Sequence, residues 1–207
     1  MLTRLIVATA LALACGACTG NQPVAQPAAD TRAATEAAPS DALPTGALVE
    51  LVPVSAELPA GLELVTDAAG PLDLRGAADL DADPAGTSRS LLQGGFRDGY
   101  SAAYTDSGSG AFVAVSVLRF DTPGGAGASF ASQLARSRQG IRAVAMAPIG
   151  DASAAFSEES AEGDVPRTVI VWFRVRDLYW RVSAGGFGDS DLSVARDIAV
   201  RLERRTS

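Results

Sequence analysis

The sequence predicts an α+β domain in which helices pack on one face of a largely antiparallel sheet. Three observations support this class. Strand-like segments come in pairs separated by short turn-forming stretches, each pair is followed by an amphipathic segment, and this order occurs over 97–138 and again over 167–205. Strands joined by short turns pair antiparallel, and helices that follow hairpins cover a sheet rather than alternate with its strands. The recurrence also suggests an internal β-β-α repeat.

The first hairpin is expected around residues 106–110. Residues 111–120 are rich in Val and Phe, which is typical of a strand, and residues 99–105 form its expected partner. The segment between them, Asp-Ser-Gly-Ser-Gly, consists entirely of turn-forming residues. We therefore expect these two strands to pair antiparallel.

The second hairpin is expected over residues 168–184. Segment 168–176 alternates, with four apolar residues on one face: Val169, Val171, Phe173 and Val175. Its other face is apolar at one end, with Ile170 and Trp172, and charged at the other. Residues 178–184 continue after a tight turn near Asp177, which again predicts an antiparallel pair.

A helix is expected after each hairpin. Thr122 is a predicted N-cap with Pro123 at the first helical position, and apolar residues then recur at a spacing of four. The C-terminal helix is expected to begin near Ser190, with one apolar stripe: Leu192, Ala195, Ile198, Ala199 and Leu202. A further helix is predicted within 72–93, interrupted at 83–86.

The N-terminus predicts export. Arg4 precedes ten uncharged, mostly apolar residues, and this run is too short to span a bilayer, which needs about 20 residues. We therefore expect residues 1–14 to be a signal peptide. Both cysteines of the chain, Cys15 and Cys18, follow it immediately.

Residues 11–15, Leu-Ala-Leu-Ala-Cys, resemble the lipobox of bacterial lipoproteins. The resemblance implies that Cys15 is acylated and becomes the mature N-terminus, anchored in the lipid bilayer at the outer face of the cytoplasmic membrane. Leucine lies at −4 and −2 rather than at −3, and Cys18 offers a second frame. Stable anchoring requires two or more acyl chains.

The composition of residues 15–48 predicts a disordered tether. Twenty of the thirty residues in 19–48 are Ala, Pro, Ser, Thr or Gly, and none is aromatic. Such a segment cannot bury enough apolar surface to offset the entropy of ordering it. Residues 49–207 are then the extracytoplasmic α+β domain, which is long enough for a real core.

Composition excludes several kinds of chemistry. The chain has no histidine, all 17 basic residues are arginines, and the region after Cys18 has no cysteine. Catalytic triads that need His, nucleophile systems that need Lys, and Cys or His metal sites in the domain are therefore excluded. No cofactor is predicted. With 24 acidic residues the net charge is −7, which disfavours nucleic acid as a partner.

Residues 148–153, Pro-Ile-Gly-Asp-Ala-Ser, precede the second pair of strands. This arrangement resembles domains of uncharacterised lipoproteins from high-GC Gram-positive bacteria, over most of 90–205. The abundance of Ala and Arg and the absence of Lys agree with a GC-rich genome. The resemblance implies a small extracytoplasmic domain and supplies no catalytic residues.

Two groups of residues are candidates for a binding surface. Aromatic side chains on the paired strands could line a ligand groove: Tyr100, Trp172, Tyr179 and Trp180. Arginines of the C-terminal half could form a basic patch for anionic lipid or cell-wall polymer: Arg174, Arg176, Arg181 and the group 201–205. The alternatives are core packing for the aromatics and surface solvation for the arginines.

Three further motifs favour structural roles. Segment 79–86 is similar to a calcium loop, but Pro84 and Ser90 replace the Gly and Glu of the EF-hand pattern, so no metal site is predicted. The acidic run 158–164 is expected to be an exposed loop. The glycines of 124–127 are expected to open a helix, since the full phosphate-binding pattern is absent.

These observations predict a membrane-anchored lipoprotein with a non-enzymatic binding or accessory role in the cell envelope. Its expected partner is an envelope protein or glycan. The missing His, Lys and Cys remove the commonest bases and nucleophiles. The alternative is a cell-envelope hydrolase that uses carboxylate residues.

Overall fold

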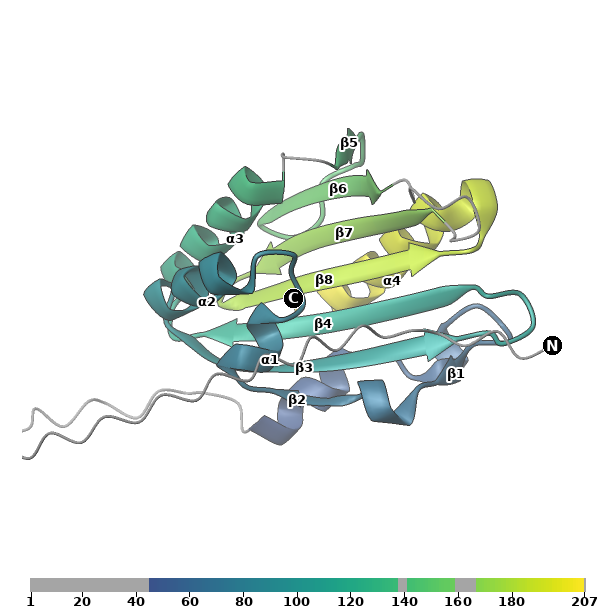
Figure 1. The fold of residues 1–207 in the computed structure, drawn as a ribbon, viewed down its shortest axis with the longest axis horizontal. Coiled ribbons are helices and arrows are strands. Elements are labelled where there is room, and N and C mark those ends of the chain that lie inside the picture. The colour runs from purple at the N-terminus through teal and green to yellow at the C-terminus, as the bar shows by residue number, and fades with distance from the viewer. Residues whose placement is uncertain (1–44, 138–140, 159–166, 207) are drawn as a thin grey trace, which may run out of the picture. The chain divides into compact units, whose positions relative to one another are not determined.

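The computed structural model describes residues 45–137, 141–158 and 167–206 (Figure 1). The expected signal peptide, Cys15, Cys18 and the tether up to residue 44 lie outside these ranges. None of the helices in the described ranges has the length and apolar character needed to cross a membrane.

The described residues form an eight-stranded sheet with the strand order β1-β3-β4-β8-β7-β6-β5, and β2 also pairs with β3. All of these strand pairs are antiparallel. The strands are β1 Glu63–Leu64, β2 Gly70–Leu72, β3 Phe96–Thr105, β4 Phe112–Phe120, β5 Arg142–Val144, β6 Ala152–Glu158, β7 Thr168–Val175 and β8 Leu178–Gly185. The helices are α1 Leu74–Ala78, α2 Pro84–Gln93, α3 Pro123–Ser137 and α4 Asp191–Arg204. The α+β class and the antiparallel sheet are thus confirmed.

Both expected hairpins are present. In the first, the Asp106 carboxylate accepts hydrogen bonds from the Gly108 amide at 2.8 Å and the Ser109 hydroxyl at 2.7 Å, which fixes the turn between β3 and β4. In the second, Arg176 adopts a positive φ of 54° in the turn between β7 and β8. Strands β4 and β8 then pair with each other and join the two hairpins into one sheet.

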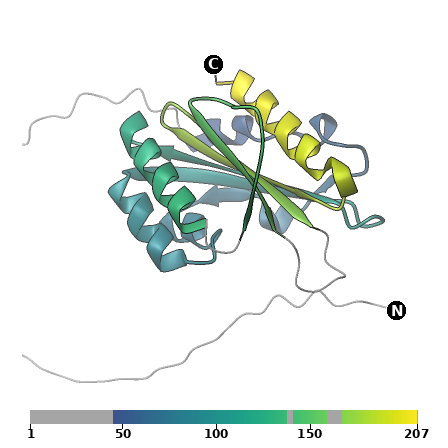
Figure 2. The same cartoon turned by 90° about the horizontal axis from the view of Figure 1, so that it is seen from above.

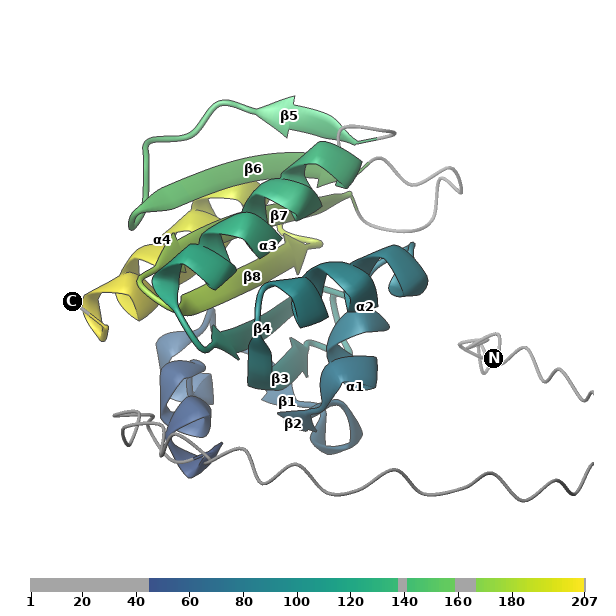
Figure 3. The ribbon, with the colours of Figure 1, turned by 90° about the vertical axis from the view of Figure 1, so that its left-hand side faces the viewer.

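Helices cover both faces of the sheet, which corrects the expectation that they lie on one face (Figure 2). Helix α4 packs on one face, and α1, α2 and α3 pack on the other, where α2 and α3 lie side by side (Figure 3). Strand β7 shows the physical reason, because Val171 and Phe173 are buried under α4 while Ile170 and Trp172 are buried on the opposite face. A strand that is apolar on both faces needs cover on both.

The order strand, strand, helix recurs as β3-β4-α3 and β7-β8-α4. The two helices nevertheless pack on opposite faces. A rotation about an axis perpendicular to the sheet would exchange β4 and β8 but would keep both helices on the same face. The repeat is therefore one of element order and not of spatial arrangement.

The expected start of α3 is confirmed by its cap. The Thr122 hydroxyl accepts a hydrogen bond from the Gly125 amide at 3.0 Å, with Pro123 as the first residue of α3. Asp83 caps α2 in the same way, accepting from the Gly86 amide at 3.0 Å. This cap and the following proline explain why 72–93 contains two helices instead of one.

The folded domain begins before residue 49, which corrects the expected end of the tether. Residues 45–51 form a 3₁₀ helix, and Leu48 is 0 % exposed within the core under α4. Val52 and Leu58 are buried in the same cluster. Leu48 closes a run in which twenty of thirty residues, 19–48, are Ala, Pro, Ser, Thr or Gly, so composition alone does not reveal that its side chain is buried.

The C-terminus of α4 holds this N-terminal segment, residues 45–58, in place. The Arg205 guanidinium donates to the carbonyl oxygens of Glu50 at 3.1 Å and Val52 at 2.9 Å and also pairs with the Glu57 carboxylate. Arg201 donates to the Glu57 carbonyl. The hydrogen bond from Arg205 is the main cause that lowers the pKa of Glu57. These arginines therefore close the domain around its own N-terminal segment.

Candidate functional site

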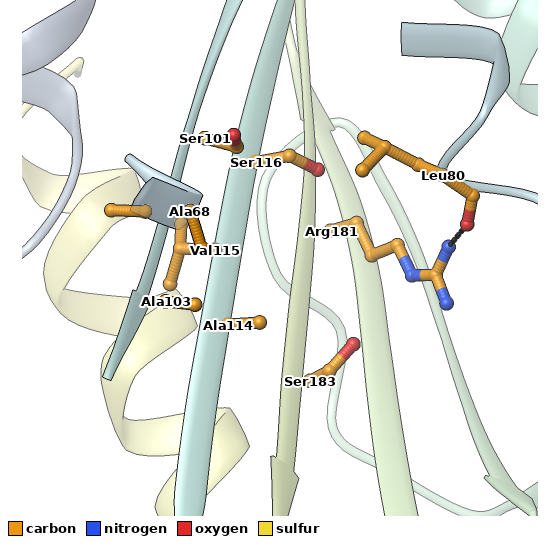
Figure 4. A pocket seen from close by; sticks show the side chains of 10 residues that line it. Ala68, Leu80, Ser101, Ala103, Ala114, Val115, Ser116, Arg181 and Ser183 are labelled. Atoms are coloured by element: carbon orange, nitrogen blue, oxygen red, sulfur yellow. Dashed lines mark hydrogen bonds between the residues drawn. The ribbon is translucent and has the colours of Figure 1, made fainter. Parts of the chain in front are cut away.

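The helical layer formed by α1, α2 and α3 leaves part of the sheet uncovered. A hollow of about 260 Å³ lies over β3, β4 and β8, beside the loop that joins α1 to α2 (Figure 4). We call this hollow the sheet-face groove. It is lined by Ala68, Leu80, Ser101, Ala102, Ala103, Ala114, Val115, Ser116, Arg181 and Ser183.

The groove exists because three neighbouring strands present small side chains at the same level of the sheet. Cross-strand pairing places Ser101 beside Ser116, and Ala103 beside Ala114. Ala114 is in turn beside Ser183 on β8. Further along β4 the same face carries Leu118 and Phe120, which are buried against the helices. Because side chains alternate between faces, the change from large to small along this face opens the hollow.

Two serine hydroxyls face the groove without a protein partner. Ser116 is 5 % exposed and Ser183 is 8 % exposed, yet both line the hollow. In the described part of the chain, no hydrogen bond joins either hydroxyl to another residue. Neither oxygen is among the fully buried polar atoms that lack a partner in the described residues, so both hydroxyls are open to the hollow. The groove therefore offers two accessible hydroxyl groups to water or a ligand.

Arg181 borders the groove at the α1–α2 loop. Its Nη1 atom donates to the Leu80 carbonyl and lies 3.3 Å from the Asp81 carboxylate, and its side chain is 25 % exposed. Asp81 also accepts a hydrogen bond from the Thr87 hydroxyl at 3.1 Å. These contacts hold the loop against β8 and place a guanidinium at the edge of the groove (Figure 4).

A second hollow of about 180 Å³ lies on the other side of the same loop, and Arg181 and Leu80 line it as well. Trp172 contributes to its wall, is 2 % exposed, and has an indole N–H with no hydrogen-bond acceptor among the described residues. Arg136 lines this hollow too, but its guanidinium is hydrogen-bonded to side chains of α2 and α3. The sheet-face groove is the larger and less charged of the two.

The four aromatic candidates do not line one groove. Tyr100 and Trp180 belong to the face under α4, where the Trp180 ring stacks on Phe173 at 4.9 Å. Trp172 and Tyr179 belong to the opposite face and make an edge-to-face contact. Burial of Tyr179 raises the pKa of its hydroxyl. The sequence signal for the hollow was instead the run of small residues on β3, β4 and β8.

The arginine candidates are likewise separated. Arg174 pairs with Asp151 at 3.2 Å, Arg181 turns inward to Leu80, and Arg201 and Arg205 hold the N-terminal segment. The charges of Arg174, Arg181 and Arg205 are thus each opposed by a carboxylate, from Asp151, Asp81 and Glu57 respectively, while Arg176 and Arg204 are exposed.

The acidic and glycine-rich motifs have structural partners. Asp79 lies 3.7 Å from Arg75, Asp81 pairs with Arg181, and Asp83 caps α2. Within the described ranges, no three His, Cys, Asp or Glu side chains are grouped so that they could hold a metal ion. Glu158 is exposed at the end of β6, and the rest of the acidic run lies outside the described residues.

The fold and the groove define an α+β domain with an antiparallel sheet covered on both faces. It is similar to the crystal structure of the extracellular domain of PknH from Mycobacterium tuberculosis, with a TM-score of 0.54 and 12 % sequence identity. The match covers 80 % of this chain and 99 % of that domain, and at this identity it concerns the fold alone. The chain matches no protein-family model and no curated protein sequence.

Proposed function

We propose that this protein is an exported, lipid-anchored lipoprotein whose domain binds a small ligand in the sheet-face groove and catalyses no reaction. One observation carries the binding role: Ser116 and Ser183 line a hollow with hydroxyls that are open to it and have no hydrogen-bond partner among the described residues. Concave sites that combine an apolar lining with a few polar groups are typical of small-molecule binding.

The proposed location rests on the sequence and on the fold. Residues 11–15 resemble a lipobox, and Cys15 is the proposed acylation site, with Cys18 as the alternative. The similar PknH domain is described as extracellular, which supports a domain that works outside the cytoplasm. Mass spectrometry of the mature N-terminus tests the anchor: an acylated Cys15 is expected, and an unmodified N-terminus beyond Cys18 would contradict it.

The non-enzymatic part of the proposal rests on the chemistry of the lining. A serine nucleophile needs an adjacent base, and the described residues that line the groove include no histidine, lysine, cysteine or carboxylate. The neighbouring carboxylate of Asp81 is already paired with Arg181 and hydrogen-bonded to Thr87. This arrangement favours binding over the alternative of a carboxylate hydrolase.

The binding role predicts that filling the groove removes binding. Ala114→Leu places a larger side chain in the hollow, while Ala143→Leu makes the same change at an exposed position on β5. The full-length protein is incubated with small molecules extracted from bacterial envelopes, and retained compounds are identified by mass spectrometry after gel filtration. We expect the wild type and Ala143→Leu to retain a compound that Ala114→Leu loses at least tenfold. Equal retention by all three proteins would contradict binding in the groove.

A further inference from the structure

We propose that the ligand of the sheet-face groove is a small organic anion, with a carboxylate bound by Arg181 and an uncharged apolar body lying over the alanines. This inference rests on the proposed function and specifies its ligand class. The inference follows from the arrangement of polar and apolar side chains in successive rows across the groove.

The polar groups form one row across the sheet. Ser101 lies beside Ser116, and Ser116 lies directly opposite Arg181 on β8. The Arg181 side chain extends from β8 toward Leu80 at the edge of the groove (Figure 4), so the carboxylate lies at that edge and the body of the ligand extends from it over the neighbouring strands, about 4.8 Å apart. A carboxylate has two oxygens and about four acceptor sites, which suits a guanidinium with several N–H donors.

Among the described residues that line the groove, Arg181 is the one with an ionisable side chain. Its Nη1 atom is engaged by Leu80 and Asp81, whereas the other terminal nitrogen points away from Leu80 (Figure 4). No hydrogen bond joins Nη2 or Nε to another residue in the described ranges. A guanidinium binds carboxylates through two parallel N–H donors, and partial burial strengthens that attraction.

The two alanines of the next row are suited to an apolar body. Ala103 and Ala114 are cross-strand neighbours, and the polar end of this row is the Ser183 hydroxyl on β8. The hollow of about 260 Å³ is smaller than the sites that take drug-sized ligands, which span about 300–1,000 Å³. At about 30 Å³ for each water-sized chemical group, the hollow holds roughly nine such groups. A chain or ring of about nine such groups therefore fills the hollow.

Asp81 competes with the ligand for Arg181. Its carboxylate lies 3.3 Å from Nη1 and lines the second hollow, not the groove, so it neutralises the guanidinium from the far side. Replacing Asp81 by asparagine removes this charge and leaves a side chain of the same shape. The proposal therefore requires Asp81→Asn to bind the anion several-fold more tightly.

Isothermal titration calorimetry of the full-length protein with octanoate and octanamide tests the inference, since these probes have the same size and differ in charge. We expect octanoate to bind at least tenfold more tightly than octanamide, because the guanidinium attracts the charged carboxylate more strongly than the neutral amide. Arg181→Gln should lose this preference, so that octanoate binds no more tightly than octanamide. Arg181→Lys should retain part of it, and Ala114→Leu should lose both probes.

The outcomes separate the two proposals. If Ala114→Leu loses both probes while Arg181→Gln binds octanoate as tightly as the wild type, the anion inference is overturned and the groove remains the binding site. If Ala114→Leu binds both probes like the wild type, or the wild type binds neither, both proposals fail. Circular dichroism and thermal melting show whether each variant is folded, and Arg181→Lys keeps the charge if Arg181→Gln does not fold.

Discussion

Gly125→Ala is expected to destabilise the domain by about 3 kcal/mol or more. Helix α3 begins against the end of α2, and a Cβ atom on Gly125 would lie 1.9 Å from the carbonyl oxygen of Gly94. That atom is backbone, so the clash cannot be relieved by rotating a side chain. Either the two helices separate or α3 begins later. Thermal melting should show a fall in the midpoint of roughly 6–12 °C.

The matched control is Gly124→Ala, one residue earlier in α3. A Cβ atom there meets nothing nearer than the Thr122 hydroxyl at 3.9 Å. Alanine is favoured over glycine in a helix by up to about 1 kcal/mol, so this variant should be as stable as the wild type or more stable. Equal loss of stability in both variants would show that the glycines serve the start of the helix and not the contact with α2.

Leu48→Ala is expected to cost about 2–5 kcal/mol, the range for a leucine truncated in a packed core. Leu48 is 0 % exposed in the cluster under α4, although it lies in a stretch dominated by small residues. Urea unfolding followed by circular dichroism measures the change in the free energy of unfolding.

Val49→Ala is the control for this position, because the neighbouring Val49 side chain is 45 % exposed. It should change the free energy of unfolding by less than about 0.5 kcal/mol. If Leu48→Ala lowers the free energy of unfolding as little as Val49→Ala does, residue 48 belongs to the tether and the domain begins at residue 49, as the composition predicts.

The hairpins and helix starts could be predicted from the sequence because short-range chemistry determines them. Gly and Ser at 107–110 form the first turn around Asp106, and Thr122 with Pro123 caps α3. Placement of the helices depends on contacts between distant segments. The apolar stripe of α4 predicts that one side of it is buried, but nothing in its own sequence says which face of the sheet it covers.

The candidate site was less predictable for a related reason. Trp172 and Trp180 stand out in the sequence, but a large aromatic side chain on a central strand fills the core on whichever face it points to. The groove is formed by small side chains on neighbouring strands. Ala103, Ala114 and Ser183 lie side by side only once β3, β4 and β8 are paired. Their alignment is a property of strand register, which depends on the whole sheet.

Methyl NMR of the full-length protein tests the central claim, that the groove binds a small ligand, most directly. Ala103 and Ala114 lie in the groove, whereas Ala195 and Ala199 belong to α4 and are buried against the opposite face of the sheet. On titration with octanoate, we predict saturable shifts of the Ala103 and Ala114 methyl resonances and none for Ala195 and Ala199. Shifts confined to the α4 face, or no saturable shift at Ala103 and Ala114, would contradict the account.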